Sequence, residues 1–508
     1  MKVVLFNNKI QIHTTNTSDF SILKSKYTAN IPKTYRVGKD LVKSYISKYL
    51  FSRSVSTPVT SYIELPYGEV SLLNDLQIPV TEYEDNRSFK LRYLSRLEVD
   101  TEFTPDILEG ITLRDYQVIG CKLALYSRLG IVESGTGSGK TEMLIALIKF
   151  LQYKYKSKLT ICIVGPTIVV LDTIIDRLHK YGYNHDDIIK NDHKTRKMND
   201  NIDFDGKIIV THAKSFDKIP DPDIIDVMIY DECHHIKSDT WSSIISKVSN
   251  VQMSIGFSAT IDKSVTDYDY RKIVGSVGKV IYSVPSHYLR SNELLAELSY
   301  IQYNLSYDVD CEIPESNDWA KIRSYITSEP RAIEISKVID SIVMRYPDTK
   351  ILVLSDTIKL SSKLLELSSN KDKSYCYFGG DTLKYYSDDN NLITTSFSSS
   401  SNDVDTRTVV YATTHMDEGV DIDKLDILIL TSGGSKKRRV VQRVGRVSRL
   451  SKTLKKGIVI DFTDSEQAVL RSQSVKRKSY TKSLGVIIED DVSTLTSLHN
   501  SLDIIEKE

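Results

Sequence analysis

Short apolar runs recur along most of the chain, and longer amphipathic stretches separate them. Between about residues 106 and 285, these runs predict buried strands at Leu129–Glu133, Leu159–Val164, Lys207–Thr211, Ile224–Tyr230 and Gln252–Phe257. The stretch Glu142–Phe150 has the apolar spacing of a helix. Strands that alternate with helices in this way are typical of βαβ units, which build a parallel sheet with helices on both faces.

The same alternation returns in the second half of the chain. Strands are predicted at Ile351–Ser355, Thr408–Ala412, Leu425–Thr431 and Gly457–Phe462, and a helix at Ala332–Met344. We therefore predict two doubly wound α/β domains in tandem, joined near Val284–Leu298.

The first hundred residues follow a different pattern. They are rich in Tyr, Ser and Lys, contain several prolines, and alternate at Val59–Leu65, as in a small α+β domain. A chain of 508 residues is long enough for about three domains. We expect a small α+β accessory domain at 1–105, a first α/β domain at 106–290 and a second at 291–508. The acidic tail from Glu489 is expected to pack weakly.

Composition limits the class of protein. The longest apolar stretches, such as Thr160–Leu171, are interrupted and too short for the roughly 18–20 residues of a membrane span. The first residues do not resemble a signal peptide. Five widely spaced Cys argue against a disulfide framework, a zinc ribbon or an iron–sulfur cluster. We expect a cytoplasmic protein, in the host cytoplasm if the chain is viral. The 67 basic and 67 acidic residues cancel, which taken alone argues against a nucleic-acid partner.

The clearest chemical motif is a glycine-rich segment between a predicted strand and a predicted helix. It consists of Ser134, Gly135, Thr136, Gly137, Ser138, Gly139, Lys140 and Thr141. Such glycines permit a tight turn whose N–H groups bind phosphates, while the lysine reaches the β/γ-phosphates and the following hydroxyl binds Mg²⁺. We predict an ATP–Mg²⁺ site here. The generic pattern begins with Gly where this chain has Ser134, and the alternative is a glycine turn without a ligand.

A pair of acids follows the apolar strand Ile224–Tyr230. Asp231 can bind Mg²⁺, and Glu232 can orient and deprotonate the attacking water. An acidic helix cap is the alternative interpretation. The nearby Cys233, His234 and His235 do not have the spacing of a zinc site.

Further motifs accompany these two in a fixed order. They are Leu113-Arg114-Asp115-Tyr116-Gln117, Gly165-Pro166-Thr167, Thr211-His212, Ser258-Ala259-Thr260, Glu418-Gly419-Val420-Asp421 and Gln442-Arg443-Val444-Gly445-Arg446-Val447-Ser448-Arg449. The set, which covers about 115–450, resembles the superfamily 2 helicases and translocases of the DExH kind. The resemblance implies two RecA-like parallel-sheet motor domains with ATP in the cleft between them.

The resemblance also implies roles for individual residues. Gln117 would read adenine, and Gly419, Asp421 and Gln442 would complete the nucleotide site. Ser258 and Thr260 would link hydrolysis to domain movement. Arg446 and Arg449 would reach the γ-phosphate from the second domain, as an arginine finger does. Pro166, Thr167, Thr211, His212, Thr413 and Thr414 would touch the nucleic-acid backbone.

Size and layout narrow the family further. About 500 residues, a small N-terminal domain and almost no C-terminal extension resemble the phage UvsW-type branch-migration DNA helicases. This similarity implies ATP-driven remodelling of forks, four-way junctions and displacement loops in recombination, repair and replication, through contacts with DNA phosphates. An RNA helicase with the same motor is the alternative, and a motor fold with decayed hydrolysis is a second one. The sequence is compatible with a monomer, and it does not determine the direction of translocation along the nucleic acid.

Positive charge is concentrated in one part of the chain, although the total charge is zero. Residues 429–482 contain 15 Lys and Arg against 3 Asp and Glu. The runs 436–439 and 476–478 within it are either DNA contacts or solvated faces. The zero total is therefore an average over a polarised chain, and it does not exclude nucleic acid.

Overall fold

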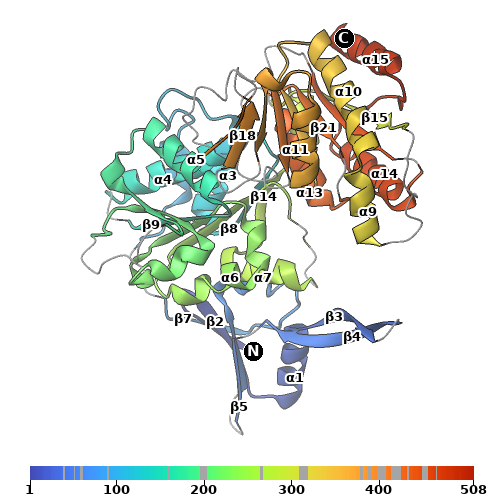
Figure 1. Cartoon of the computed structure of the whole chain (residues 1–508). Helices are drawn as coiled ribbons and strands as arrows, with labels where there is room; N and C mark the ends of the chain where they lie inside the picture. Colours follow the sequence, from blue (N-terminus) through green and yellow to red (C-terminus); the bar gives the residue numbers. More distant parts are fainter. Residues whose placement is uncertain are drawn as a thin grey trace. The chain divides into compact units, whose positions relative to one another are not determined.

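The computed structural model describes most of the chain. The described residues are 1–37, 40–50, 52–57, 61–87, 91–156, 159–194, 203–261, 263, 267–307, 318–377, 382–386, 391–396, 408–413, 425–431, 434–448, 456–464 and 466–507. The chain folds into two compact units (Figure 1). Unit 1 contains 1–134 and 139–284, and unit 2 contains 285–508 together with the short segment 135–138.

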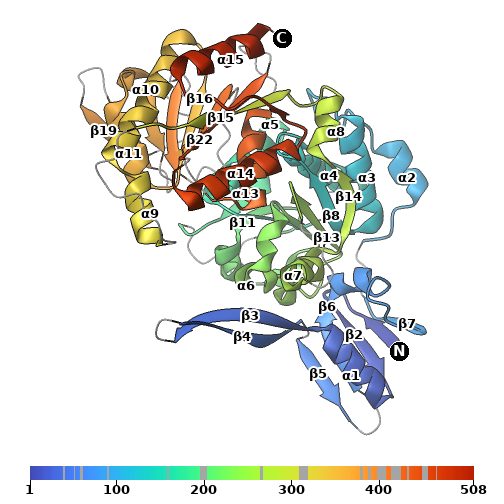
Figure 2. The same cartoon turned by 90° about the vertical axis from the view of Figure 1, so that its right-hand side faces the viewer.

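The first part of unit 1 is a small α+β layer, as the sequence predicts. Its five-stranded sheet has the order β5 (Arg53–Ser56), β6 (Ser61–Pro66), β2 (Lys9–Thr14), β1 (Lys2–Leu5), β7 (Glu82–Asp85). Helix α1 (Thr17–Lys26) contributes Phe20 and Leu23 to the core of this layer. Strands β3 (Thr28–Val37) and β4 (Asp40–Tyr49) form a separate two-stranded ribbon (Figure 2). A short 3₁₀ helix, η1 (Tyr67–Leu72), and α2 (Arg96–Glu102) lead to the larger sheet.

The larger sheet of unit 1 is parallel throughout. Its order is β10 (Ile188–Asn191), β11 (Ile208–His212), β9 (Ile161–Gly165), β12 (Val227–Tyr230), β13 (Met253–Ser258), β8 (Leu129–Ser134), β14 (Val280–Val284). The helices are α3 (Asp115–Ser127), α4 (Lys140–Lys154), α5 (Ile168–Lys180), α6 (Asp239–Ser242) and α7 (Tyr268–Val277). Strands β9, β12 and β13 are buried along their whole length, because helices cover both faces. All five predicted strands are confirmed, whereas the edge strands β10 and β14 are additional.

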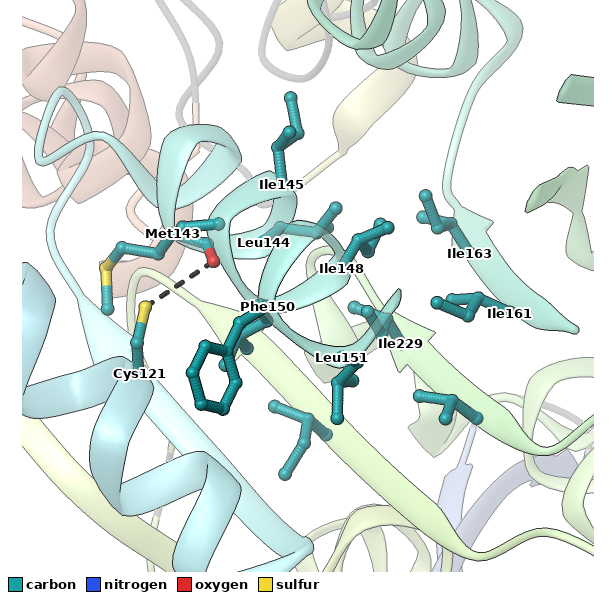
Figure 3. Packing of buried hydrophobic residues seen from close by; sticks show 14 of the residues in the cluster. Cys121, Met143, Leu144, Ile145, Ile148, Phe150, Leu151, Ile161, Ile163 and Ile229 are labelled. Atoms are coloured by element: carbon teal, nitrogen blue, oxygen red, sulfur yellow. Dashed lines mark hydrogen bonds between the residues drawn. The ribbon is translucent and has the colours of Figure 1, made fainter. Parts of the chain in front are cut away.

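Helices α3 and α4 pack against this sheet through a continuous apolar core (Figure 3). The buried thiol of Cys121 in α3 donates to the carbonyl oxygen of Met143 in α4, at 3.5 Å between sulfur and oxygen. Burial raises the pKa of Cys121, so the thiol stays protonated. Among the described residues, the cysteines at 121, 162, 233 and 376 are free and buried.

Unit 2 contains a nine-stranded sheet. Its order is β19 (Leu392–Ser396), β18 (Thr382–Tyr386), β17 (Ser374–Tyr377), β20 (Val409–Thr413), β16 (Ile351–Ser355), β21 (Ile427–Leu430), β22 (Gly457–Thr463), β15 (Leu298–Asn304), β23 (Ile487–Ile488). Its helices include α8 (Ser286–Ser291), α9 (Trp319–Ile326), α10 (Glu329–Arg345), α11 (Ile358–Leu367), α13 (Lys437–Val444), α14 (Ala468–Lys482) and α15 (Leu495–Lys507). The sheet is parallel except at one edge, where β18 is antiparallel to both β17 and β19.

Two expectations for unit 2 are wrong. The acidic tail does not pack weakly, because α15 buries Leu498, Leu502 and Ile505 in the core. These residues are three or four positions apart and line one face of a helix, although the surrounding polar residues conceal the pattern. Arg477 is neither solvated nor a DNA contact. It is buried and makes two 2.8 Å hydrogen bonds to Asp461.

Within the described part of the chain, no helix is both long and apolar enough to cross a membrane.

Candidate functional site

The glycine-rich loop connects β8 to α4, so it lies at the N-terminal end of a fifteen-residue helix. A helix N-terminus presents unpaired N–H groups and positive potential. Gly137 and Gly139 have φ angles of 81° and 79°, a backbone conformation that favours glycine. A Cβ at Gly139 would also lie 2.3 Å from Nε2 of Gln117. These features give the loop the backbone geometry of an anion site.

Lys140 lies between the loop and the acids that follow β12. Its Nζ donates to the carbonyl oxygen of Ser134 at 3.3 Å and lies 3.6 Å from Oε1 of Glu232. Both charged side chains are largely buried. The hydroxyl of Ser134 is fully buried and has no hydrogen-bond partner among the described residues. A cation, a carboxylate and an unsatisfied hydroxyl beside a helix N-terminus fit a phosphate-bearing ligand.

Asp231 begins the acidic pair at the end of β12, where its backbone N–H donates to the carbonyl oxygen of Val164 at 2.9 Å. Desolvation raises the pKa of Asp231, and repulsion from Glu232 raises it further, while Lys140 acts in the opposite direction. A bound divalent cation would relieve both effects. Thr141 occupies the first turn of α4. The hydroxyl and carboxylate oxygens of Thr141 and Asp231 are the hard donors that Mg²⁺ prefers.

His234 links Glu232 to the segment that follows β13. Its Nδ1 lies 2.8 Å from Oγ of Ser258 and 3.1 Å from Oε2 of Glu232. Ser258 also donates to Oε2 of Glu232 and to the carbonyl oxygen of Thr260, both at 3.4 Å. The structure thus connects the predicted coupling residues with the predicted base. The sequence pattern argues against a zinc site at His234, but it does not predict the contact of His234 with Ser258.

Glu133 is a residue of this region that sequence reasoning missed. One carboxylate oxygen accepts from the backbone N–H of Ile261 at 2.8 Å. The other accepts from Oγ of Ser283 and lies near Nζ of Lys263, both at 2.6 Å. Glu133 therefore holds the segment after Ser258-Ala259-Thr260 against β8 and β14. An acid at the end of an otherwise apolar strand is the signal that could have identified it.

Gln117 belongs to the first turn of α3 and is nearly buried beside Gly139. Its Oε1 accepts from the backbone N–H of Arg114 at 2.8 Å. The side-chain oxygen therefore caps the helix, and the adenine contact inferred for Gln117 stays a prediction.

The predicted nucleic-acid contacts of unit 1 lie at the ends of β9 and β11. Nε2 of His212 lies 3.0 Å from the carbonyl oxygen of Pro166, so the two motifs are adjacent. Thr167 caps α5 by accepting from the N–H of Val170. Thr211 is fully buried, and its hydroxyl accepts from Nδ2 of Asn191 at 3.1 Å. A phosphate contact at Thr211 would therefore involve its backbone.

Unit 2 contains the remaining predicted residues. Gln442 is buried on α13, and Arg446 lies in the 3₁₀ turn Gly445–Ser448 that follows this helix. Thr413 ends β20 and is buried. The other four, which are Thr414, Gly419, Asp421 and Arg449, lie outside the described residues.

Two family models match the chain. "Type III restriction enzyme, res subunit" matches residues 110–263, and "Helicase conserved C-terminal domain" matches residues 334–451. Together they cover more than half of the 508 residues.

Several individual proteins are similar to this chain at low sequence identity. The DNA 3'-5' translocase XPB2 of Sulfurisphaera tokodaii is 23% identical over 78% of this chain and 92% of its own length. A protein of Acanthamoeba polyphaga mimivirus, described as "Putative ATP-dependent RNA helicase L396", is 26% identical over 69% of this chain and 63% of its own length. The uvsW ATP-dependent DNA helicase of Enterobacteria phage T4 is 22% identical over 70% of this chain and 69% of its own length. Among solved structures, S. cerevisiae Dbp5 bound to RNA and ADP BeF3 covers 78% of this chain and 97% of its own, with a TM-score of 0.53 and 13% identity. The similarity to Dbp5 supports the expected tandem RecA-like fold.

Proposed function

Since this chain belongs to the superfamily 2 helicases, we propose that it is an ATP-driven DNA helicase or translocase that remodels branched DNA. The substrates would be forks, four-way junctions and displacement loops that arise in recombination, repair and replication. The observation that carries the catalytic part is the connected set of Lys140, Glu232, His234 and Ser258 at the carboxyl edge of the parallel sheet. Ligands of open α/β sheets bind at this edge.

We propose a separate role in ATP hydrolysis for each residue of this site. ATP bound with Mg²⁺ supplies the phosphoryl group whose transfer to water provides the free energy. Lys140 would bind the β/γ-phosphates, while Thr141 and Asp231 would hold the metal ion. Glu232 orients the attacking water and accepts its proton. His234 bonds both Glu232 and Ser258, so a change at the γ-phosphate can reach the segment that links hydrolysis to movement.

The second motor domain completes the proposed site. Gln442, Arg446 and Arg449 would approach the γ-phosphate when the two domains close, with Gly419 and Asp421 on the nucleotide side. We assign 106–290 and 291–508 to the two motor domains and 1–105 to a domain that holds a duplex arm.

DNA is the proposed substrate because two relatives, XPB2 and uvsW, are described as acting on DNA. The basic stretch 429–482 offers charge for phosphate contacts, and its Lys436 and Lys437 are exposed. The second candidate is RNA, because the mimivirus relative is described as an RNA helicase.

One experiment distinguishes these substrates. ATP hydrolysis and strand separation are measured with four-way DNA junctions, forked DNA, linear DNA duplexes and RNA duplexes of matched length. We expect the branched DNAs to stimulate both activities most. Greater stimulation by RNA would favour the second candidate, and a lack of DNA-stimulated hydrolysis would reject the DNA assignment.

A further inference from the structure

A cavity of about 50 Å³ lies in unit 1 at the amino-terminal ends of β8 and β13. One water molecule needs about 10–15 Å³, so the cavity has room for a group of several heavy atoms. The N-terminal layer contributes Asn7, Tyr67 and Arg87 to its lining, and the motor layer contributes Arg128 and Ser254. The glycine-rich loop follows the opposite end of β8, a strand of six residues that spans roughly 17 Å.

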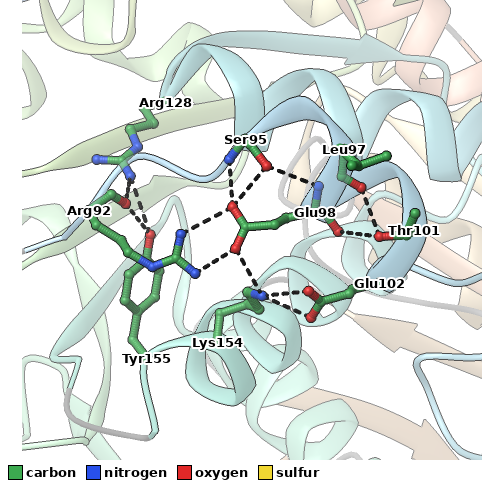
Figure 4. Close-up of polar contacts among 9 residues, drawn as sticks. All are labelled: Arg92, Ser95, Leu97, Glu98, Thr101, Glu102, Arg128, Lys154 and Tyr155. Carbon is green, nitrogen blue, oxygen red and sulfur yellow. Dashed lines mark hydrogen bonds and ion pairs between the residues drawn. The ribbon is translucent and has the colours of Figure 1, made fainter.

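The lining of this cavity is positively charged. It includes two arginines and neither Asp nor Glu. Arg128 is only 7% exposed. Its guanidinium donates to the carbonyl oxygen of Leu91 at 3.0 Å. It also donates to the carbonyl oxygen of Arg92 and to the hydroxyl of Tyr155 at 3.2 Å (Figure 4), and all three acceptors are uncharged. In the part of the chain that the structure describes, no carboxylate forms an ion pair with Arg128.

Arg87 is the second cation of the lining. It pairs with Asp85, which is not part of the lining. Its Nη1 donates to the hydroxyl of Tyr67 at 2.6 Å and to that of Tyr93 at 3.3 Å. The ring of Tyr93 also covers the guanidinium of Arg128, at 4.0 Å from its centroid. Arg87 thus pairs with Asp85, Arg128 donates to uncharged acceptors, and Tyr93 contacts both guanidinium groups.

The walls of the cavity are fixed by backbone packing. A Cβ at Gly68 would lie 1.8 Å from the carbonyl oxygen of Val274, so the N-terminal layer and α7 touch directly. Next to this contact, Arg271 and Glu69 form a buried ion pair with bonds of 3.1 and 2.8 Å. The donors around the cavity are therefore held in place before any ligand binds, which lowers the entropic cost of binding.

We propose that this cavity binds a phosphate group at a site separate from the glycine-rich loop. A buried guanidinium without a carboxylate partner favours an anion. Guanidinium groups and hydroxyls match the several oxygens of phosphate. The phosphate could belong to a nucleic-acid end or be the free ion. The proposal does not depend on hydrolysis at the loop.

Calorimetric titration with inorganic phosphate tests this site. The Lys140→Ala variant is used, because it weakens phosphate binding at the loop. We expect one remaining site, weakened about tenfold by Arg87→Gln and by Arg128→Gln, as expected for the loss of a charge-assisted hydrogen bond. Arg92→Gln removes a neighbouring exposed arginine that does not line the cavity and should leave the affinity unchanged.

The decisive variant is Arg87→Gln, since its side chain is partly exposed and its loss leaves Asp85 at the surface. Circular dichroism confirms that each variant is folded. The proposal is overturned if Lys140→Ala binds no phosphate, or if Arg87→Gln binds it as tightly as its parent. Neither result would affect DNA-stimulated hydrolysis in the wild type. The helicase function and the phosphate site are therefore tested independently.

The source of the phosphate is tested by DNA duplexes with 5′-phosphate or 5′-hydroxyl ends. Tighter binding of the 5′-phosphate duplex, lost in Arg87→Gln, identifies a nucleic-acid end as the ligand. Equal binding of both duplexes, together with the calorimetric site, identifies free phosphate. Both results support the site.

Discussion

The two edges of the parallel sheet in unit 1 use cations differently. At the carboxyl edge, Lys140 lies 3.6 Å from Glu232, beside Asp231. At the amino edge, Arg271 forms a fully buried ion pair with Glu69. Among the described residues, the acceptors of the Arg128 guanidinium are uncharged. A lysine beside two carboxylates favours a ligand that contains both a phosphate and a metal ion, because the lysine attracts the anion and the carboxylates attract the cation. A fully buried pair holds two layers together, and a buried arginine without an acid suits an anion alone.

The largest expected effect is at the carboxyl edge. Glu232→Gln removes the proposed base and should lower ATP turnover by about 10²–10⁴-fold. Lys140→Ala removes the phosphate ligand and should abolish strand separation. Thermal stability should change little, because both side chains serve ligand chemistry more than packing. Steady-state hydrolysis with DNA present is the measurement.

Lys149→Ala is the matched control, since Lys149 lies on the same helix and its Nζ donates to the carbonyl oxygen of Tyr181 at 2.9 Å, away from the acidic pair. Normal turnover in either Lys140→Ala or Glu232→Gln would show that the site assignment is wrong.

The next effect concerns stability at the amino edge. Arg271→Met leaves the buried Glu69 without its partner and should cost about 3–5 kcal/mol of local stability. Hydrogen exchange in η1 and α7 measures this loss. The double variant Arg271→Met/Glu69→Leu should regain most of it, because no unpaired charge is left.

Lys279→Met provides the comparison for Arg271→Met. Its ion pair with Asp75 is exposed, so the cost should stay below about 1 kcal/mol. Equal effects of the two variants would contradict the structural role of the buried pair.

A smaller effect is expected at the link between the base and the coupling segment. Ser258→Ala removes the hydrogen bonds to His234 and Glu232, worth about threefold to tenfold in rate. Strand separation per ATP should fall more than hydrolysis itself. Ser246→Ala, at an exposed serine, should change neither rate. A parallel loss of both rates in Ser258→Ala would indicate a catalytic defect and not an uncoupling.

The smallest effect depends on pH. A hydrogen bond from Arg92, followed by bonds from Ser95, holds the pKa of Glu98 well below its ordinary 4.5 (Figure 4). Because the folded pKa is depressed, this contribution is complete above pH 4.5 and is lost as the pH falls below that value. Glu98→Gln should therefore unfold with a shallower acid dependence than the wild type. Thermal melts between about pH 5 and pH 3 measure it, and identical slopes would contradict the prediction.

Much of the fold could be predicted because strands buried on both faces are continuous apolar runs. Ile351–Ser355 was predicted to the residue, and it is the strand β16. The edge strand β23 and the strand β18, which lies next to the other edge, are short or partly polar, and the pairing of β23 depends on a neighbour far along the chain. The packing of helix α15 could not be predicted from its acidic composition, although Leu498, Leu502 and Ile505 have the spacing of one helix face.

For the candidate site, the local motifs could be recognised because their chemistry depends on neighbouring residues. The loop residues and the Asp231–Glu232 pair are of this kind. The hydrogen bond between His234 and Ser258 joins positions 24 residues apart, and that from the N–H of Ile261 to Glu133 joins positions 128 apart. The cavity was beyond prediction, because Arg87, Arg128 and Ser254 become neighbours only when two layers pack together.

Arg128 also has a backbone cost. It ends α3 with a φ angle of 55°, in the left-handed region where glycine is the usual residue and other residues cost roughly 1–2 kcal/mol. A chain optimised only for thermal robustness would have glycine at this position. Arg128→Gly would relax the backbone but would detach residues 91–92 and leave the cavity without its most buried cation. For a protein engineer, this position marks a trade-off between a more heat-resistant enzyme and a ligand-responsive one.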